Sequence, residues 1–92
     1  MESKISDVVM SLTGRDRERL FMVIYAEPEY LYLADGRLRR VERPKKKKRK
    51  HTLFIGENET RAAVRLRNGE KVSNSEIRRS LEEYIKAAGG AD

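Results

Sequence analysis

The side chains of this chain that could do chemistry are mostly cations, and they gather in one segment. Residues 37–50 contain ten Lys or Arg and a single acid, Glu42, which gives this segment a local charge of +9. The whole chain carries +6, so the other 78 residues carry −3. A basic segment on a slightly acidic body indicates a polyanionic partner, because a charge that served only solubility would be spread over the surface.

The centre of this segment is a run of six consecutive cations, residues 45–50, preceded by Pro44. Adjacent like charges repel one another unless counterions or phosphates neutralise them, so packing does not explain the run. We predict that residues 43–51 form an extended, solvated basic arm that binds phosphates and makes no core contact. Two alternatives stay open: a nuclear localisation signal, a motif that basic proteins often contain by chance, and a plain solvated linker.

A second basic pattern lies in residues 14–19, where Arg15, Arg17 and Arg19 alternate with two acids. In an extended segment this spacing places three guanidinium groups on one side, which suits bidentate phosphate contacts and stacking on exposed bases. The alternative is a solvated hairpin tip whose arginines are balanced by Asp16 and Glu18. The nearby lysine run favours RNA binding.

Two further residue types bear on the same surface. Tyr30 and Tyr32 are candidates for base stacking, or they simply cover the outer face of a sheet. His51 is the only histidine and has no second ligand at metal spacing, so it is interpreted as a phosphate contact or a bystander. The predicted RNA-binding residues are Arg15, Arg17, Arg19, Arg37, Arg39, Arg40, Arg43, Lys45, Lys46, Lys47, Lys48, Arg49, Lys50 and His51.

Catalytic chemistry finds little support in the sequence. There is no cysteine, no evident nucleophile and base pair, and no glycine loop that would cradle a phosphate. We therefore expect a protein that is not an enzyme and has no metal and no cofactor. The first twelve residues lack the layout of a signal peptide and no apolar stretch is long enough to cross a bilayer, so we expect a cytoplasmic protein.

The residues before the basic segment are predicted to form strands. Residues 7–12 alternate, with Val8, Met10 and Leu12 on one face, and residues 20–25 are a continuous apolar run typical of a strand covered on both faces. A proline interrupts the pattern at residues 27–29, after which residues 30–33 alternate again. We expect an inward-facing set in a curled antiparallel sheet: Leu12, Val23, Leu31 and Leu33.

The remaining elements follow from turn and cap signals. Asp35-Gly36 predicts a type I′ hairpin turn, with Leu38 and Val41 in a short strand behind it. Residues 64–67 alternate before Asn68-Gly69 and predict one more strand. Ser73 and Glu76 form a capping box, which predicts a helix that Gly89-Gly90 would end. This helix would pack through one stripe of side chains: Ile77, Leu81, Tyr84, Ile85 and Ala88.

We thus predict a single domain over residues 1–92. Its parts are a barrel core at residues 7–42, the basic arm at 43–51, additional strands within 52–72 and a C-terminal helix at 73–88. Short strands with charged loops and one terminal helix indicate a mainly β fold, a small barrel or roll.

Residues 8–17, the apolar strand at 21–25, Leu33-Ala34-Asp35-Gly36 and Arg39-Arg40-Val41-Glu42 resemble a KOW motif, and the basic stretch 44–51 follows it. With Ile77 and Leu81 in the C-terminal helix, the chain resembles the short bacterial KOW-domain RNA-binding proteins that are related to large-subunit ribosomal proteins of the L-fourteen-e type. The resemblance implies an SH3-like β-barrel with a C-terminal α-helix, RNA as the partner and no cofactor. Residues 14–17 match the RNA-facing loop of that family.

The chain departs from the family pattern at two positions, since Glu18 and Asp7 stand where KOW loops usually have glycine. Our first interpretation of the function is ribosomal RNA binding, on the ribosome or its large subunit, by a protein that is a monomer when free. One alternative is a KOW module that recruits a protein, as in transcription elongation. Another is a nuclear basic protein imported through residues 44–50.

Overall fold

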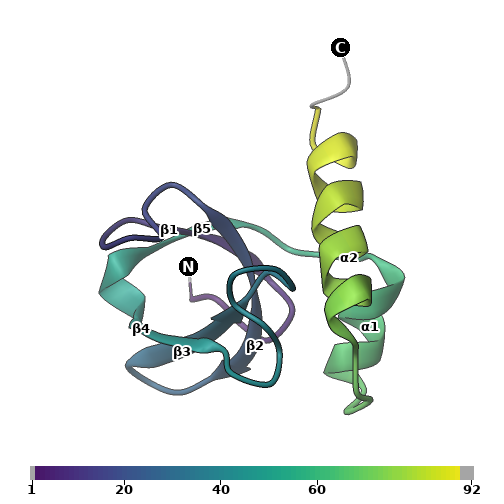
Figure 1. Cartoon of the computed structure of the whole chain (residues 1–92), viewed down its shortest axis with the longest axis horizontal. Helices are drawn as coiled ribbons and strands as arrows, with labels where there is room; N and C mark the ends of the chain where they lie inside the picture. Colours follow the sequence, from purple (N-terminus) through teal and green to yellow (C-terminus); the bar gives the residue numbers. More distant parts are fainter. Residues whose placement is uncertain (1, 90–92) are drawn as a thin grey trace.

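The computed structural model describes residues 2–89 and contains a five-stranded antiparallel sheet followed by two helices (Figure 1). The first three strands are β1 (Val8–Ser11), β2 (Leu20–Ala26) and β3 (Tyr30–Ala34). β4 (Lys45–Lys48) and β5 (Thr52–Gly56) complete the sheet. The helices are α1 (Arg61–Arg67) and α2 (Asn74–Ala87). The mainly β class predicted from the sequence is confirmed.

The order of strands across the sheet is β4-β3-β2-β1-β5. Its two edge strands, β4 and β5, are joined by a single turn of 3₁₀ helix, η1 (Arg49–His51), and the sheet curls so that these edges approach one another (Figure 1). Within residues 2–89 no ladder pairs β4 with β5, so the sheet is curled but not closed.

The alternation of side chains across each strand produces two apolar clusters, one on each face of the sheet. Val9, Phe21, Val23, Leu31 and Leu33 are fully buried together inside the curl. On the outer face Val8 and Met22 pack with Ile77 and Leu81 of α2. The prediction that β2 is covered on both faces is therefore confirmed, as is the inward direction of Leu31 and Leu33.

The C-terminal helix predicted from the capping box is confirmed. The Ser73 hydroxyl accepts a hydrogen bond from the Glu76 amide at 3.1 Å, and the Glu76 carboxylate accepts one from the Ser73 amide at 2.8 Å. Ile77 and Leu81 are buried and Tyr84 is half-buried, whereas Ile85 and Ala88 are exposed. The stripe therefore packs against the outer cluster through Ile77, Leu81 and Tyr84 and leaves Ile85 and Ala88 exposed. Gly89 has a φ of 105°, as a helix stop requires, and Gly90 lies outside the described residues.

The strand predicted at residues 64–67 is wrong, because these residues belong to α1. The Thr60 hydroxyl caps this helix by accepting from the Ala63 amide. Ala62 and Ala63 are buried beside α2, with Leu66 packed against the same cluster. Residues 52–72 therefore contain one strand and one helix rather than additional strands alone.

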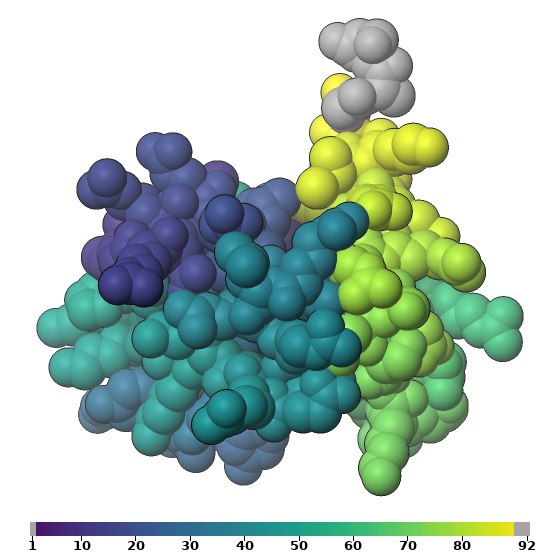
Figure 2. All heavy atoms as spheres, viewed as in Figure 1, coloured from purple at the N-terminus to yellow at the C-terminus, as the bar shows by residue number. Residues whose placement is uncertain are grey.

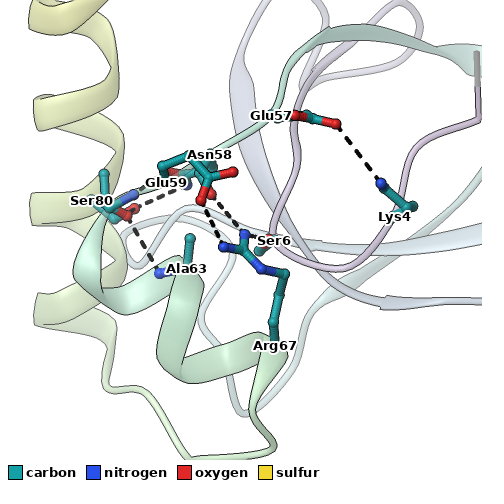
Figure 3. A network of polar contacts seen from close by, with 9 residues as sticks. Lys4, Ser6, Glu57, Asn58, Glu59, Ala63, Arg67 and Ser80 are labelled. Atoms are coloured by element: carbon teal, nitrogen blue, oxygen red, sulfur yellow. Dashed lines mark hydrogen bonds and ion pairs between the residues drawn. The ribbon is translucent and has the colours of Figure 1, made fainter.

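A polar network joins α1 to α2 and to the segments just outside the sheet (Figure 3). The Arg67 guanidinium donates to Ser6 Oγ at 2.7 Å, to the Asn58 carbonyl at 2.8 Å and to Glu59 Oε1 at 2.8 Å. Asn58, fully buried, donates in turn to Ser80 Oγ of α2 at 3.1 Å. The two helices and the segment before β1 are thus tied together by hydrogen bonds as well as by apolar packing.

The segment between β3 and β4 differs from the prediction. No strand forms around Leu38 and Val41, and Leu38 is 61% exposed. Asp35-Gly36 does not form a two-residue hairpin, because the strand that pairs with β3 begins only at Lys45. Residues 35–44 instead form a loop that lies against α2, visible in blue-teal in Figure 2. Two hydrogen bonds join this loop to α2: the Gly36 carbonyl accepts one from the Arg78 guanidinium, and the Val41 amide donates one to the Asn74 side chain.

Leu12 is the remaining departure among the expected core residues. It lies beyond the end of β1 and is 42% exposed, while Val23, Leu31 and Leu33 are buried as expected. The strand ends at Ser11 because the chain turns there into the β1–β2 loop, which is held by the Ser11 side chain.

Candidate nucleic-acid interface

The lysine run is not a solvated arm. Lys45–Lys48 form the edge strand β4, paired with β3 in the register Tyr30↔Lys48 to Leu33↔Lys45. Strand geometry directs successive side chains to opposite faces, which relieves part of the repulsion between neighbouring ammonium groups. Lysine is also a common residue at exposed sheet edges, where its charge discourages pairing with other chains.

One face of β4 is directed at the β1–β2 loop. Lys47 is 8% exposed, and its ammonium donates to Ser11 Oγ and to the Thr13 carbonyl, both at 2.8 Å. Burial lowers the pKa of Lys47, an effect that Asp16 opposes and the charges of Lys45 and Arg39 reinforce. Lys47 therefore holds the loop to the sheet, and the expectation that it makes no core contact is wrong.

The β1–β2 loop is a compact double turn rather than the extended segment that the alternating arginines predicted. The Arg17 amide donates to the Gly14 carbonyl at 3.2 Å and the Arg19 amide to the Asp16 carbonyl at 3.0 Å. Gly14 and Glu18 both have left-handed backbone angles, with φ of 78° and 70°. Arg15, Arg17 and Arg19 remain exposed, but strand alternation does not align them.

The acid between two of these arginines has a structural partner. Asp16 is buried, and its Oδ2 accepts from both Nε and a terminal nitrogen of Arg39, at 3.1 Å and 2.8 Å. The β1–β2 loop is thus fixed on one side to the loop at residues 35–44 and on the other to β4. Asp16 therefore does not balance the charge of the exposed loop arginines, as the solvated-hairpin alternative assumed.

The predicted RNA-binding residues divide into paired and unpaired cations. Arg49 donates to the carbonyls of Ser3 and Glu27, both at 2.8 Å, so it supports the fold. A guanidinium nitrogen of Arg37 lies 3.5 Å from Glu82 Oε2, and Arg40 Nε lies 3.8 Å from Glu42 Oε1. Both ion pairs are exposed and contribute little to stability. Within residues 2–89, the exposed cations of the set without a carboxylate partner are Arg15, Arg17, Arg19, Arg43, Lys46, Lys48 and Lys50.

The other face of β4 meets the tyrosines. Lys46 Nζ lies 4.4 Å from the centre of the Tyr30 ring and 5.8 Å from that of Tyr32, both within cation–π range. Tyr30 and Tyr32 are half-buried and face outward as predicted. Tyr25, 54% exposed, joins them with its ring centre 5.6 Å from that of Tyr32. The sequence did not single out Tyr25, because it ends an apolar run and alternation from Val23 would turn it inward.

The other groups considered for chemistry contribute less. His51 lies half-buried in η1, and Lys45 at the start of β4 and Pro44 before it are half-buried as well. Among residues 2–89 no three His, Asp or Glu side chains are grouped closely enough to hold a metal ion. No helix in the described part of the chain has the length and apolar character needed to cross a membrane.

Comparison of the chain with protein-family models and with curated protein sequences found no match. The candidate site consists of a docked loop with exposed arginines, an edge strand of lysines, and a tyrosine cluster beside that strand.

Proposed function

We propose that this chain is an RNA-binding protein that acts through the β1–β2 loop and β4 and that associates with ribosomal RNA. One observation carries the proposal: two separate basic segments, far apart in sequence, are fixed side by side. The Lys47 bond to the Thr13 carbonyl and the Arg39 pair with Asp16 join them. The cations that do this work are buried or half-buried, while Arg15, Arg17, Lys46 and Lys48 stay exposed.

The charge of this surface is what a polyanion requires. Phosphates neutralised by lysine and arginine release counterions, which supplies most of the affinity of such proteins and makes it depend on salt. A fixed loop adds selectivity for shape, since guanidinium groups held in place meet phosphates at set distances. Irregular or A-form RNA presents such phosphate arrangements, whereas base-specific contacts are not needed.

The fold forms part of the proposal. A curled antiparallel sheet whose edge strands are joined by one turn of 3₁₀ helix is consistent with an SH3-like barrel of the KOW kind. The backbone at Glu18 supports the resemblance, because this residue has a φ of 70° at the position where KOW loops usually have glycine.

Sedimentation of a cell lysate tests the ribosomal part of the proposal. We expect the protein to travel with the large ribosomal subunit at low salt and to be released at least partly at high salt, because exposed cations supply the binding. Ribosomal RNA should also outcompete duplex DNA of equal charge. A protein that stays at the top of the gradient at every salt concentration, or that binds duplex DNA as tightly as RNA, would contradict the proposal.

A further inference from the structure

The outer face of the sheet is only partly covered. Met22 and Ala34 pack beneath the helices, whereas Tyr25, Tyr30 and Tyr32, at the other ends of the same strands, do not belong to either apolar cluster. Three of the four tyrosines of the chain, which has no tryptophan, thus share one uncovered area next to the lysines of β4.

A β-bulge directs Tyr25 to this face. The register between β2 and β3 runs from Val23↔Leu33 to Tyr25↔Tyr32, so Ile24 is an extra residue opposite β3. Val23 then points into the curl, and both Ile24 and Tyr25 lie on the outer side, Ile24 against the helix cluster and Tyr25 towards Tyr32. Without the bulge, alternation would turn Tyr25 inward. Bulges are over-represented where a side chain is re-aimed next to a functional site.

The neighbours of Tyr25 hold an aromatic surface open to solvent. The Tyr25 and Tyr32 rings are tilted at 57°, and the Tyr32 hydroxyl donates to Glu27 Oε1 at 3.3 Å, which fixes the supporting ring. Lys46 and Lys48 of β4 lie on the same face of the sheet as Tyr30 and Tyr32 of β3, and both lysines are exposed. Tyr25 itself remains more than half exposed.

We propose that this surface binds an unpaired nucleobase of RNA, stacked on Tyr25, with the flanking phosphates held by Lys46 and Lys48. The proposal rests on the RNA-binding function proposed above and adds to it a preference for single-stranded nucleotides. An aromatic ring flanked by cations matches a ligand that is itself aromatic and anionic, and stacking tolerates any base because each has a π-face. An apolar protein segment would not use the two lysines.

The test compares two RNA probes, a single-stranded oligonucleotide and a fully paired duplex with the same number of phosphates. Tyr25→Ala should weaken binding of the single strand about five-fold or more and leave binding of the duplex within about two-fold of wild type. Tyr25→Phe should keep the wild-type affinity because it keeps the ring. Tyr25→Leu, which keeps apolar bulk without a π-face, should behave as Tyr25→Ala does.

Tyrosine fluorescence gives a second readout, since three of the four tyrosines lie on this surface and the chain has no tryptophan. The single strand should quench the emission of the wild-type protein, and the quenched amplitude should fall in Tyr25→Phe although the affinity does not. Exposed Leu38, on the loop beside α2, provides the control variant Leu38→Ala, which should bind both probes as wild type does.

The outcomes separate this proposal from the broader one. Failure of the wild-type protein to bind either probe would remove the RNA-binding function itself. If both probes bind and Tyr25→Ala equals wild type on the single strand, the stacking site is wrong while RNA binding stands. Equal losses on both probes, or wild-type affinity in Tyr25→Leu, would also overturn stacking, the latter in favour of an apolar contact with a protein.

Discussion

At the scale of single residues, the backbone of the β1–β2 loop is strained at Glu18. Its φ of 70° lies in the left-handed region, which costs a residue with a side chain about 1 kcal/mol relative to glycine. The side chain is exposed and makes no hydrogen bond or ion pair in the described residues, so no side-chain contact offsets that cost. The Glu18 amide donates to the Ser11 carbonyl at 2.7 Å, a bond that glycine would keep.

Glu18→Gly should therefore raise the free energy of unfolding by about 0.5–1 kcal/mol, a gain partly offset by the greater freedom of glycine in the unfolded chain. Chemical denaturation measures it. Glu18→Ala removes the same charge but keeps the Cβ, so it should show no gain; equal stabilisation by the two variants would mean that charge rather than backbone strain is responsible.

Asp7, the other departure from the proposed resemblance to a KOW loop, is buried at the turn before β1. Burial raises its pKa above the usual 3.8, although the Lys4 amide, which donates to Oδ2 at 2.7 Å, opposes the shift. The folded state therefore holds this proton more tightly than the unfolded state does. Its contribution to stability is fully present below pH 3.8 and is lost as the pH rises through the raised pKa.

Asp7→Asn should remove this loss, because an amide can still accept from Lys4 without carrying a charge. The variant should be more stable than wild type at neutral pH, and the two should converge in acid. Unfolding midpoints measured from about pH 3.5 to 7 test it. Curves that stay parallel across this range would show that Asp7 does not titrate differently on folding.

At the scale of elements, docking of the β1–β2 loop and the count of charges predict opposite effects of Asp16→Asn on RNA affinity. Asp16→Asn removes an acid from a surface proposed to bind phosphates, which alone should strengthen RNA binding. It also weakens the pair with Arg39 that fixes the loop. We expect RNA affinity to fall several-fold, because a charge-assisted bond of this kind contributes about 1.5–3 kcal/mol to holding the geometry.

The matched control is Glu18→Gln, which removes an exposed acid from the same loop and should leave RNA affinity equal or slightly higher. Filter binding at one fixed salt concentration compares the two variants. If Asp16→Asn binds RNA as tightly as Glu18→Gln does, the position of the loop does not matter for binding.

The docking of α2 rests on three residues of its apolar stripe, Ile77, Leu81 and Tyr84. Leu81 is 7% exposed within the outer cluster, so Leu81→Ala should lower the free energy of unfolding by about 2–5 kcal/mol. Ile85, one turn later, is 46% exposed, and Ile85→Ala should cost much less. Thermal unfolding of the two variants decides it, and equal midpoints would show that the helix does not pack as described.

Elements whose cause is local could be predicted from the sequence, and those set by distant partners could not. The start of α2 follows from Ser73 and Glu76 within one turn. β4 does not, because a lysine run looks solvated until β3 supplies backbone partners and Tyr30 a surface for Lys46. Val64 and Leu66 have the spacing of a strand, whereas the buried face of α1 is formed by Ala62, Ala63 and Leu66 at helical spacing and Val64 is exposed. The cap at Thr60 was the missed signal for α1.

The same limit applies to the candidate site. The two basic segments could be identified from the sequence, since their Lys and Arg residues are concentrated in residues 14–19 and 37–50. The roles of Lys47, Arg39 and Arg49 were not, because burial divides a run of similar cations into those that hold the fold and those left free. The outward direction of Tyr25 depends on a β-bulge that the local sequence pattern does not predict.

At the scale of the whole molecule, the proposed binding surface and the helices occupy opposite ends. β4 and η1 lie at the left of Figure 1, and α1 and α2 at the right. Exposed cations occur at both ends, including Lys71, Arg79 and Lys86 near and on the helices. If RNA affinity depends on where the cations lie and not on their number, removing the first set should lower it and removing the second should not.

The dependence of RNA affinity on salt tests this claim most directly. One variant replaces Lys46, Lys48 and Lys50 with Gln, and the other replaces Lys71, Arg79 and Lys86 with Gln, so each loses three of the cations that give the net charge of +6. Each lost phosphate contact reduces the slope of log affinity against log salt by about 0.7–0.9. We predict a slope flatter by about 2 to 3 units in the first variant and an unchanged slope in the second. Equal slopes in the two variants would contradict the account, because RNA would then respond to net charge and not to the position of the lysines in β4 and η1.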